Sequence, residues 1–470
     1  MSRATAWIEA AGIPAVGVTC RGFSPPARLV GKAEGVPHMR LLEFPPPNIG
    51  AMRPDDIFAA TLAKMDELEK LFLQPAPGSE AAAVAVTPKA LGNSSARDIV
   101  FSGDLREVND YFRQQIWSDG LPITPPTIEE VEAMLGFTDR APDEVIGLLP
   151  PTRLPATVWK VAVNGVMAGC RPEYMPVLLA IAEAVSAERF GIENVGSTVG
   201  LTPLIILNGP IIKQLGFHSG QGVLRPQAQA NITVSRFLRL LMVNVAGYRL
   251  GESDMATFGR NYYPVLAEAE DESPWPPMAV DRGFGACTNL ITVQSADTTG
   301  HSFLTEGPAE SHLRVIAREI VRELGGNLLV AMEHFGGHIS PVLGLTPLVA
   351  GIFAKAGYSK LDVKRWLFEH ALVPARLFDE QLTRIEQGYN LQEAVKRGSL
   401  DKRFALSDDP ERLVPVLHKP EELQIVVCGA PNRNRSFICG QFGKYGGDVS
   451  REIALPKDWS GRLEALRRAG

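Results

Sequence analysis

The segment IPAVGVTCRGFSPPARLVGKAEGVPHMRLLEF, residues 13–44, decides the fold class. Its two apolar runs, 14–20 and 39–44, predict buried strands, and residues 26–35 between them predict a helix. Further helices are predicted over residues 3–11 and from Pro54 to about Leu73, where apolar positions recur at helical spacing. An alternation of helices and strands is typical of an open parallel α/β sheet. Two strands cannot bury both faces of a sheet, so this small module must pack on something else.

The rest of the chain predicts a larger α/β body made of several layers. Residues 74–97 are rich in Ala, Pro, Ser and Gly and read as a linker, so we expect a module over 1–73 and a body over 98–470, with two subdomains dividing near 270–285. Strands are predicted at 202–209, 288–296, 327–332 and 423–430. Helices are predicted at 128–135, 172–186, 230–246, 311–324, 347–357, 359–371 and 377–388. Ser359 and Asp362 form an acidic variant of the capping box for the helix over 359–371.

Composition narrows the class of protein. The 470 residues carry a net charge of -6 with both signs interspersed, which argues against a nucleic-acid partner. No apolar run reaches the roughly 18 residues of a membrane span, and the first residues do not resemble a signal peptide. The five cysteines are scattered and never form a C-x-x-C pair, which favours a reducing compartment. We therefore expect a soluble cytoplasmic protein without a membrane partner.

Longer strings in the chain resemble known families. Residues 13–50 resemble the C-terminal half of the UGSC family of (seleno)proteins, whose members carry a C-G-S-C motif that is absent from this chain. The body is similar to a large bacterial family linked to that module, through WSDGLPITPPT (117–127), VNGVMAGCRPEYMPVLLA (163–180), TPLIILNGP (202–210), SPWPPMAVDRGF (273–284) and GYSKLDVKRWLFEHA (357–371). The resemblance implies thiol or selenol chemistry, or a site that works beside it. We also expect a homo-oligomer or a complex with a UGSC-type chain; the missing motif could lie on such a partner or have been lost.

Cys170 is the leading candidate for a catalytic residue. The sequence Cys170-Arg171-Pro172-Glu173 places the cysteine just before a predicted helix, where free backbone N–H groups and the helix dipole would favour a thiolate. The alternative is a small apolar residue packed against the helix start, because free cysteines are often buried.

Loops that follow predicted strands supply candidate substrate-binding residues. Ligands bind at the carboxyl ends of strands in open α/β sheets. Cys428 follows one strand, as a second candidate catalytic thiol, and the loop after it could hold an anionic group through arginines. A glycine-rich turn at 218–222 could expose N–H groups to an anion before a long helix. The alternative for both loops is an ordinary solvated surface. The candidate binding residues are Asn208, Ser219, Arg225, Asn432, Arg433 and Arg435.

Histidines suggest a metal site, with zinc or iron as the candidate ions. His334 and His338 lie four residues apart, which places both rings on one face of a helix, although two glycines between them disfavour a helix. His301, at the end of a predicted strand, could join them.

Three hypotheses for function remain open. The first is an enzyme of the oxidoreductase or lyase type that acts on a small organic substrate through a thiol, with Asp119 as a candidate general base. Asp119 lies in a turn whose simplest role is structural. The second is a metal-dependent lyase or hydrolase. The third is a non-catalytic subunit that completes a partner chain carrying the C-G-S-C motif.

Overall fold

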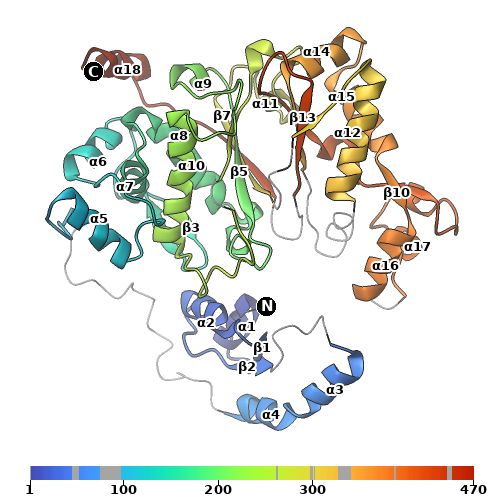
Figure 1. Ribbon diagram of the computed structural model, residues 1–470. Helices are drawn as coiled ribbons and strands as arrows, with labels where there is room; N and C mark the ends of the chain where they lie inside the picture. Colours follow the sequence, from blue (N-terminus) through green and yellow to red (C-terminus); the bar gives the residue numbers. More distant parts are fainter. Residues whose placement is uncertain are drawn as a thin grey trace. The chain divides into compact units, whose positions relative to one another are not determined.

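The computed structural model describes residues 2–44, 52–74, 97–260, 263–296, 300, 302–325, 340–385, 388–441 and 447–469 (Figure 1). The chain forms two compact units. The first comprises Met1–Gly120, Leu148–Ala156 and Leu241–Met255. The second comprises Leu121–Gly147, Thr157–Leu240 and Ala256–Gly470. Residues 75–96 of the predicted linker lie outside the described residues, and the division into module, linker and body stays a prediction.

The first unit begins with the predicted alternation of helices and strands. Strands β1 (Gly17–Cys20) and β2 (Leu41–Phe44) pair in parallel, with Gly17 opposite Leu41. Helices α1 (Ser2–Ala10) and α2 (Ser24–Ala33) pack against each other through a small core of Ala6, Ala27 and Met39. The prediction of a parallel α/β module is confirmed.

The predicted long helix from Pro54 to Leu73 is two helices, α3 (Pro54–Leu62) and α4 (Met65–Leu73). The break has a local cause, because the Lys64 amide bonds to the Thr61 carbonyl, three residues back, and ends the α-helical pattern. Helix α4 then restarts with acidic residues in its first turn, where they favour a helix N-terminus. The expectation of one continuous helix was wrong.

A buried arginine fixes the end of α4. Arg40 is 4% exposed and pairs with the carboxylate of Glu9 on α1. Its Nη1 also donates to the carbonyls of Leu71, Phe72 and Gln74, at 3.1, 3.3 and 3.2 Å. These carbonyls lack partners within the helix, so one guanidinium both neutralises Glu9 and caps α4.

The second unit contains two mixed four-stranded sheets. The first has the order β14-β7-β5-β6 and the second the order β12-β9-β13-β8. In the first, β5 runs parallel to β6 and antiparallel to β7; in the second, β9 runs parallel to β12 and antiparallel to β13. The strands of the first sheet are β5 (Thr202–Asn208), β6 (Val265–Ala267), β7 (Leu290–Ala296) and β14 (Asp448–Glu452). Those of the second are β8 (Ser302–Leu304), β9 (Val342–Leu345), β12 (Gln424–Val427) and β13 (Arg435–Cys439).

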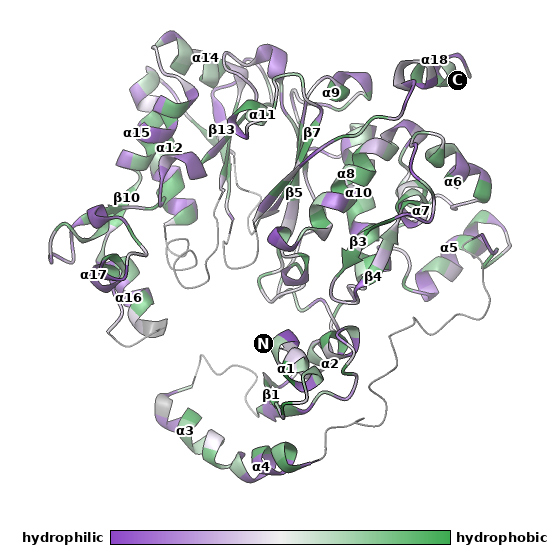
Figure 2. Ribbon diagram, turned by 180° about the vertical axis from the view of Figure 1, so that it is seen from behind, coloured by the Kyte–Doolittle hydropathy of each residue, from purple (hydrophilic) through white to green (hydrophobic). Residues whose placement is uncertain are grey.

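The two sheets face each other between helices and form four layers. Side chains of both sheets share one buried cluster, which includes Leu204, Ile206, Val342 and Val426. Helix α8 (Met175–Ser186) packs on β7 and β14 of the first sheet and buries 10 of its 12 residues (Figure 2). The α/β fold class with a multi-layer body is therefore confirmed.

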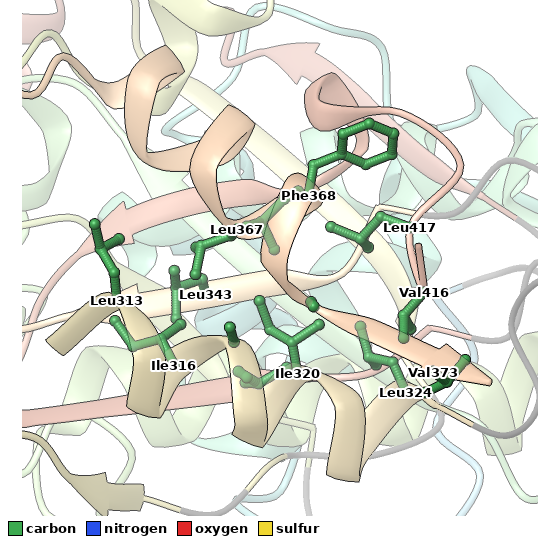
Figure 3. Packing of buried hydrophobic residues seen from close by; sticks show 14 of the residues in the cluster. Leu313, Ile316, Ile320, Leu324, Leu343, Leu367, Phe368, Val373, Val416 and Leu417 are labelled. Atoms are coloured by element: carbon green, nitrogen blue, oxygen red, sulfur yellow. The ribbon is translucent and has the colours of Figure 1, made fainter. Parts of the chain in front are cut away.

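On the outer side of the second sheet, α12 (Ala309–Leu324) packs against α15 (Lys360–His370). Figure 3 shows one apolar side of α12 meeting Leu343 of β9 and Leu367 of α15. The contributing residues of α12 are Leu313, Ile316, Ile320 and Leu324, whose spacing follows the helical repeat. The predicted start of α15 is confirmed, because Ser359 and Asp362 form a reciprocal capping box.

The other helices bear out most of the predicted positions. The predicted helix over 230–246 is α10, which continues as a π-helical turn, and residues 172–174 form a 3-10 turn before α8. The remaining helices are α5 (Leu105–Gln114), α6 (Ile128–Leu135), α7 (Val158–Ala168), α9 (Ile211–Gln214), α10 (Gln229–Leu241), α11 (Met278–Asp281), α14 (Pro347–Lys355), α16 (Arg376–Ile385), α17 (Leu391–Lys396) and α18 (Trp459–Ala469). Two-stranded sheets pair β3 (Val145–Leu149) with β4 (Leu154–Thr157), and β10 (Leu372–Pro374) with β11 (Leu413–Pro415). Among the described residues, no helix combines the length and the apolar composition that a membrane crossing requires.

Several strands were not predicted. Strands β9, β13 and β14 have four or five residues each, and the loop expected around Arg435 is the start of β13. The apolar run of this strand is short and polar residues flank it in the sequence, so the periodicity does not predict a strand there. The strand predicted at 327–332 lies outside the described residues.

Candidate functional site

Two of the predicted strand-end residues meet a buried carboxyl group that the sequence did not single out. Asn208 ends β5 and donates from Nδ2 to Glu268 Oε2 at 2.5 Å. Glu268 follows β6, is 1% exposed and also accepts from the Met278 amide at 2.8 Å. Burial raises the pKa of the thiol of Cys428, just after β12, and the charge of Glu268 acts in the same direction. The apolar run before Glu268 is the signal that could have located this strand end.

Burial raises the pKa of Glu268 to about 7, and the charge of Lys360 only partly opposes this effect. Glu268 Oε1 and Asn208 Oδ1 have no hydrogen-bond partner among the described residues. The protonated carboxyl is therefore the form that the folded protein favours below neutral pH.

The raised pKa of Glu268 predicts a pH-dependent difference in stability between the protein and Glu268→Gln. Below about pH 4.5 the carboxyl is protonated in both folded and unfolded chains, so its contribution is complete; as pH rises through 7, the buried group must ionise and that contribution is lost. A shift from 4.5 to about 7 corresponds to about 3 kcal/mol. Urea unfolding at pH 5 and pH 8 should show the unmodified protein losing most of this amount relative to Glu268→Gln. Parallel pH profiles would contradict the assignment.

The other predicted loop residues do not gather at one site. The Gly429 amide bonds to the Ser219 carbonyl at 2.7 Å, so the loops at 218–222 and 428–430 touch. Arg225, Asn432 and Arg433 are exposed. Arg435 Nη1 reaches the Ser302 carbonyl at 3.4 Å. Their roles in binding stay predictions.

Cys170 sits at the predicted position, but its environment opposes a thiolate. Burial raises the pKa of the Cys170 thiol to about 12, and a hydrogen bond with Thr233 and the charge of Arg236 only partly counter this shift. Cys439, also buried, has its pKa raised to about 12 by burial. Burial thus disfavours the thiolate expected from the position before a helix, and the catalytic role of Cys170 stays a prediction.

The remaining predicted residues belong to different units or lie outside the described residues. Asp119 is half-buried and belongs to the first unit, whereas Cys170 and Cys428 belong to the second. His301, His334 and His338 lie outside the described residues, so the predicted metal site stays a prediction. Within the described ranges, no three His, Cys, Asp or Glu side chains are placed to hold a metal ion.

The second unit contains a cavity of about 530 Å³ where edge strands of its two sheets contribute side chains. Gln424 comes from β12, and Ser450 from β14. Adjacent residues Asp281 and Arg282, at the end of α11, also line it. We call this space the Asp281–Arg282 cavity. The other lining residues are Ala187, Arg189, Phe284, Ser340, Lys419, Glu421, Glu422, Asp448, Val449 and Arg451.

Asp281 binds two buried lysines from α15. Its Oδ2 lies 3.1 Å from Lys360 Nζ and 3.6 Å from Lys364 Nζ, and each lysine is 6% exposed. Lys360 also donates to the Pro276 carbonyl at 2.7 Å. Burial lowers the pKa of Lys364, although the negative charge of Asp281 acts in the opposite direction. The lysine spacing of four residues places both ammonium groups on one face of the helix.

Asp448 is likewise shared by two cations. Arg282 Nη2 donates to Asp448, and Arg189 Nη2 lies 3.3 Å from Asp448 Oδ1. Arg282 Nε donates to Ser450 Oγ at 2.7 Å, which fixes the plane of the guanidinium. Each of these two acids therefore neutralises only part of the positive charge beside it.

Three of the segments that resemble the bacterial family supply residues to the contacts around Asp281 and Glu268, next to this cavity. Residues 273–284 supply Asp281 and Arg282, and residues 357–371 supply both lysines. Residues 202–210 supply Asn208, which is bonded to Glu268, and Glu268 in turn holds the first amide of α11. The sequence reveals none of these contacts, because the partners are far apart along the chain.

Comparisons of the chain with models of protein families, with curated proteins and with solved structures find no match.

Proposed function

We propose that the chain is an enzyme, or the substrate-binding subunit of one, that moves a proton to or from a small organic molecule in the Asp281–Arg282 cavity. The observation that carries this proposal is the Asp281 carboxylate at the cavity wall, held by two buried lysines. Burial lowers the pKa of Lys364, so this ammonium group releases its proton more readily than an exposed lysine does. A carboxylate in contact with such a group can accept a proton from a substrate or return one.

The surroundings of the cavity support the same proposal. Its volume falls within the roughly 300–1,000 Å³ that small-molecule sites occupy. Glu268, with its raised pKa, lies within the electrostatic reach of Lys360. Titratable groups with shifted pKa values tend to cluster at functional sites.

Proton transfer replaces thiol chemistry in this proposal. Burial raises the pKa of the thiols of Cys170, Cys428 and Cys439, which favours neutral sulfur at physiological pH. A thiol or selenol on a UGSC-type partner, as the sequence resemblance implies, stays compatible with a proton-transferring site in this chain.

The pH dependence of lysine acylation tests the role of Lys364. The intact protein is treated briefly with acetic anhydride across a pH series, and labelling is followed for each lysine by mass spectrometry. Because burial lowers its pKa, Lys364 should reach half of its maximal labelling at a lower pH than the exposed Lys355 on α14. If both lysines follow one pH profile, Lys364 is only a structural cation and the proposal fails.

A non-catalytic subunit is the second candidate, and the β1–β2 sheet favours it. Within the described residues this sheet has only two strands, so each strand has an edge that could pair with another chain. Val18 on β1 is 45% exposed, which leaves apolar surface at the sheet. Analytical ultracentrifugation of the purified full chain decides this alternative. A stable monomer that retains activity would exclude an obligatory partner.

A further inference from the structure

We infer that the molecule bound in the Asp281–Arg282 cavity is a small organic oxyanion, carrying a carboxylate or a phosphate group that the Arg189–Arg282 side of the cavity recognises. This inference specifies the substrate class of the proposed enzyme and in that sense rests on the proposed function. Its support is a different set of contacts, on the wall formed by β14.

Charged side chains of both signs form much of the lining of the cavity. Four acids line it, Asp281, Glu421, Glu422 and Asp448, alongside four cations, Arg189, Arg282, Lys419 and Arg451. Lys360 and Lys364, which are not part of this lining, contact Asp281 and compensate its charge, so three other acids line the cavity beside the four cations. Lining cations whose charge is not fully compensated attract anions.

The acids that line the cavity do not satisfy all of the hydrogen-bond donors of its cations. Asp448 is 3% exposed, and its single charge is divided between two guanidinium groups. Glu422 Oε2 accepts from the backbone amides of His418 and Lys419, at 3.1 and 3.4 Å, and its Oε1 lies 3.7 Å from His418 Nδ1. A guanidinium has five N–H donors, so Arg282 keeps donors beyond the two that bind Asp448 and Ser450.

The geometry of Arg189 and Arg282 suits an oxyanion. Guanidinium groups bind carboxylate and phosphate through paired, planar hydrogen bonds. Arg189 is held in place by Gly447, whose amide donates to the Arg189 carbonyl at 2.8 Å. A Cβ added at Gly447 would lie 3.3 Å from Arg189 Nε, so the arginine side chain rests directly on this glycine. Both guanidiniums are thus positioned before any ligand arrives, which reduces the entropy lost on binding.

Isothermal titration calorimetry of the full chain tests the inference with three probes: succinate, glycerol 3-phosphate and the dication putrescine. We expect one or both anions to bind and putrescine not to bind. Whichever anion binds more tightly identifies carboxylate or phosphate as the recognised group. Arg282→Gln should weaken anion binding by about tenfold or more, because it removes a charge-assisted pair of hydrogen bonds.

Two further variants keep the test independent of folding. Arg189→Gln, at a side chain that is 57% exposed, should weaken binding about threefold or more without disturbing the fold. Arg314→Gln, on the exposed side of α12, should leave binding unchanged. The inference is overturned if neither anion binds, if putrescine binds instead, or if the two cavity variants bind anions as well as Arg314→Gln does.

Calorimetry and lysine labelling together separate a failure of the oxyanion inference from a failure of the proposed proton transfer. If anion binding depends on Arg282 but Lys364 is labelled like an exposed lysine, the oxyanion ligand is supported and the proposed proton transfer is rejected. If Lys364 is labelled at a lower pH than Lys355 but neither anion binds, the proposed proton transfer is supported and the oxyanion inference is rejected.

Discussion

Replacing Asp281 with alanine is expected to lower the free energy of unfolding of the second unit by about 3 kcal/mol and to abolish the function of the cavity. The loss of the carboxylate leaves Lys360 and Lys364, each 6% exposed, without the acid that both contact. An unpaired buried charge costs several kcal/mol because water no longer compensates it. Urea unfolding followed by the fluorescence of Trp275 and Trp366, which pack against the core of this unit, measures the loss.

A matched control is Asp143→Ala, which removes an exposed acid of the same unit. It should shift the unfolding free energy by less than about 0.5 kcal/mol. Combining Asp281→Ala with Lys364→Met should recover part of the stability, because the buried positive charge of Lys364 is removed together with its acidic partner. Equal stability of Asp281→Ala and Asp143→Ala would show that the lysines do not depend on Asp281.

Arg40→Ala is expected to destabilise the first unit by about 3 to 5 kcal/mol, enough to unfold a module with so small a core. The change strands the buried carboxylate of Glu9 and removes the cap from three carbonyls at the end of α4. Hydrogen exchange read by mass spectrometry should show loss of protection across residues 2–44 and 65–73.

Two variants separate the charge of Arg40 from its position. Arg28→Ala, at an exposed site on α2, should leave exchange unchanged. Glu9→Leu combined with Arg40→Met should restore protection over residues 2–44, because a buried ion pair can be replaced by apolar side chains of similar size. Helix α4 should remain less protected in this double variant, since its carbonyls still lack the guanidinium. Full protection in Arg40→Ala would contradict both roles.

Local signals in the sequence carried most of the correct predictions. The start of α15 depends on Ser359 and Asp362, three residues apart, and the structure has the capping box that they predict. The strand around Ile205 was predictable because it contains a continuous apolar run, and the strand around Val293 because it is rich in β-branched and apolar residues. Strand β14 has a polar sequence, DVSRE, and exists because it pairs with β7, from which it is far separated in the chain. No local pattern in the sequence predicts such a strand.

The candidate site was predictable only in part, for the same reason. Asn208 and Cys428 were identified from their places at the ends of strands; Asn208 is hydrogen-bonded to Glu268, and Cys428 lies within the electrostatic reach of Glu268. The ion pairs of Asp281 and Asp448 join segments that are distant in sequence, so residue types alone could not single them out. The position of Cys170 before a helix predicts a thiolate, whereas burial raises the pKa of its thiol, and position relative to a helix does not determine burial.

The short helix α11 implies a constraint on how this chain can change in length. Its last residue, Asp281, contacts α15, while the next residue, Arg282, contacts β14. One residue advances a helix by about 100°, so a single insertion or deletion between Met278 and Arg282 would turn one of these side chains away from its partners. Homologous chains that keep this cavity should therefore tolerate substitutions along α11 more readily than gaps. In an alignment, the segment should appear as a block of fixed length between more variable neighbours.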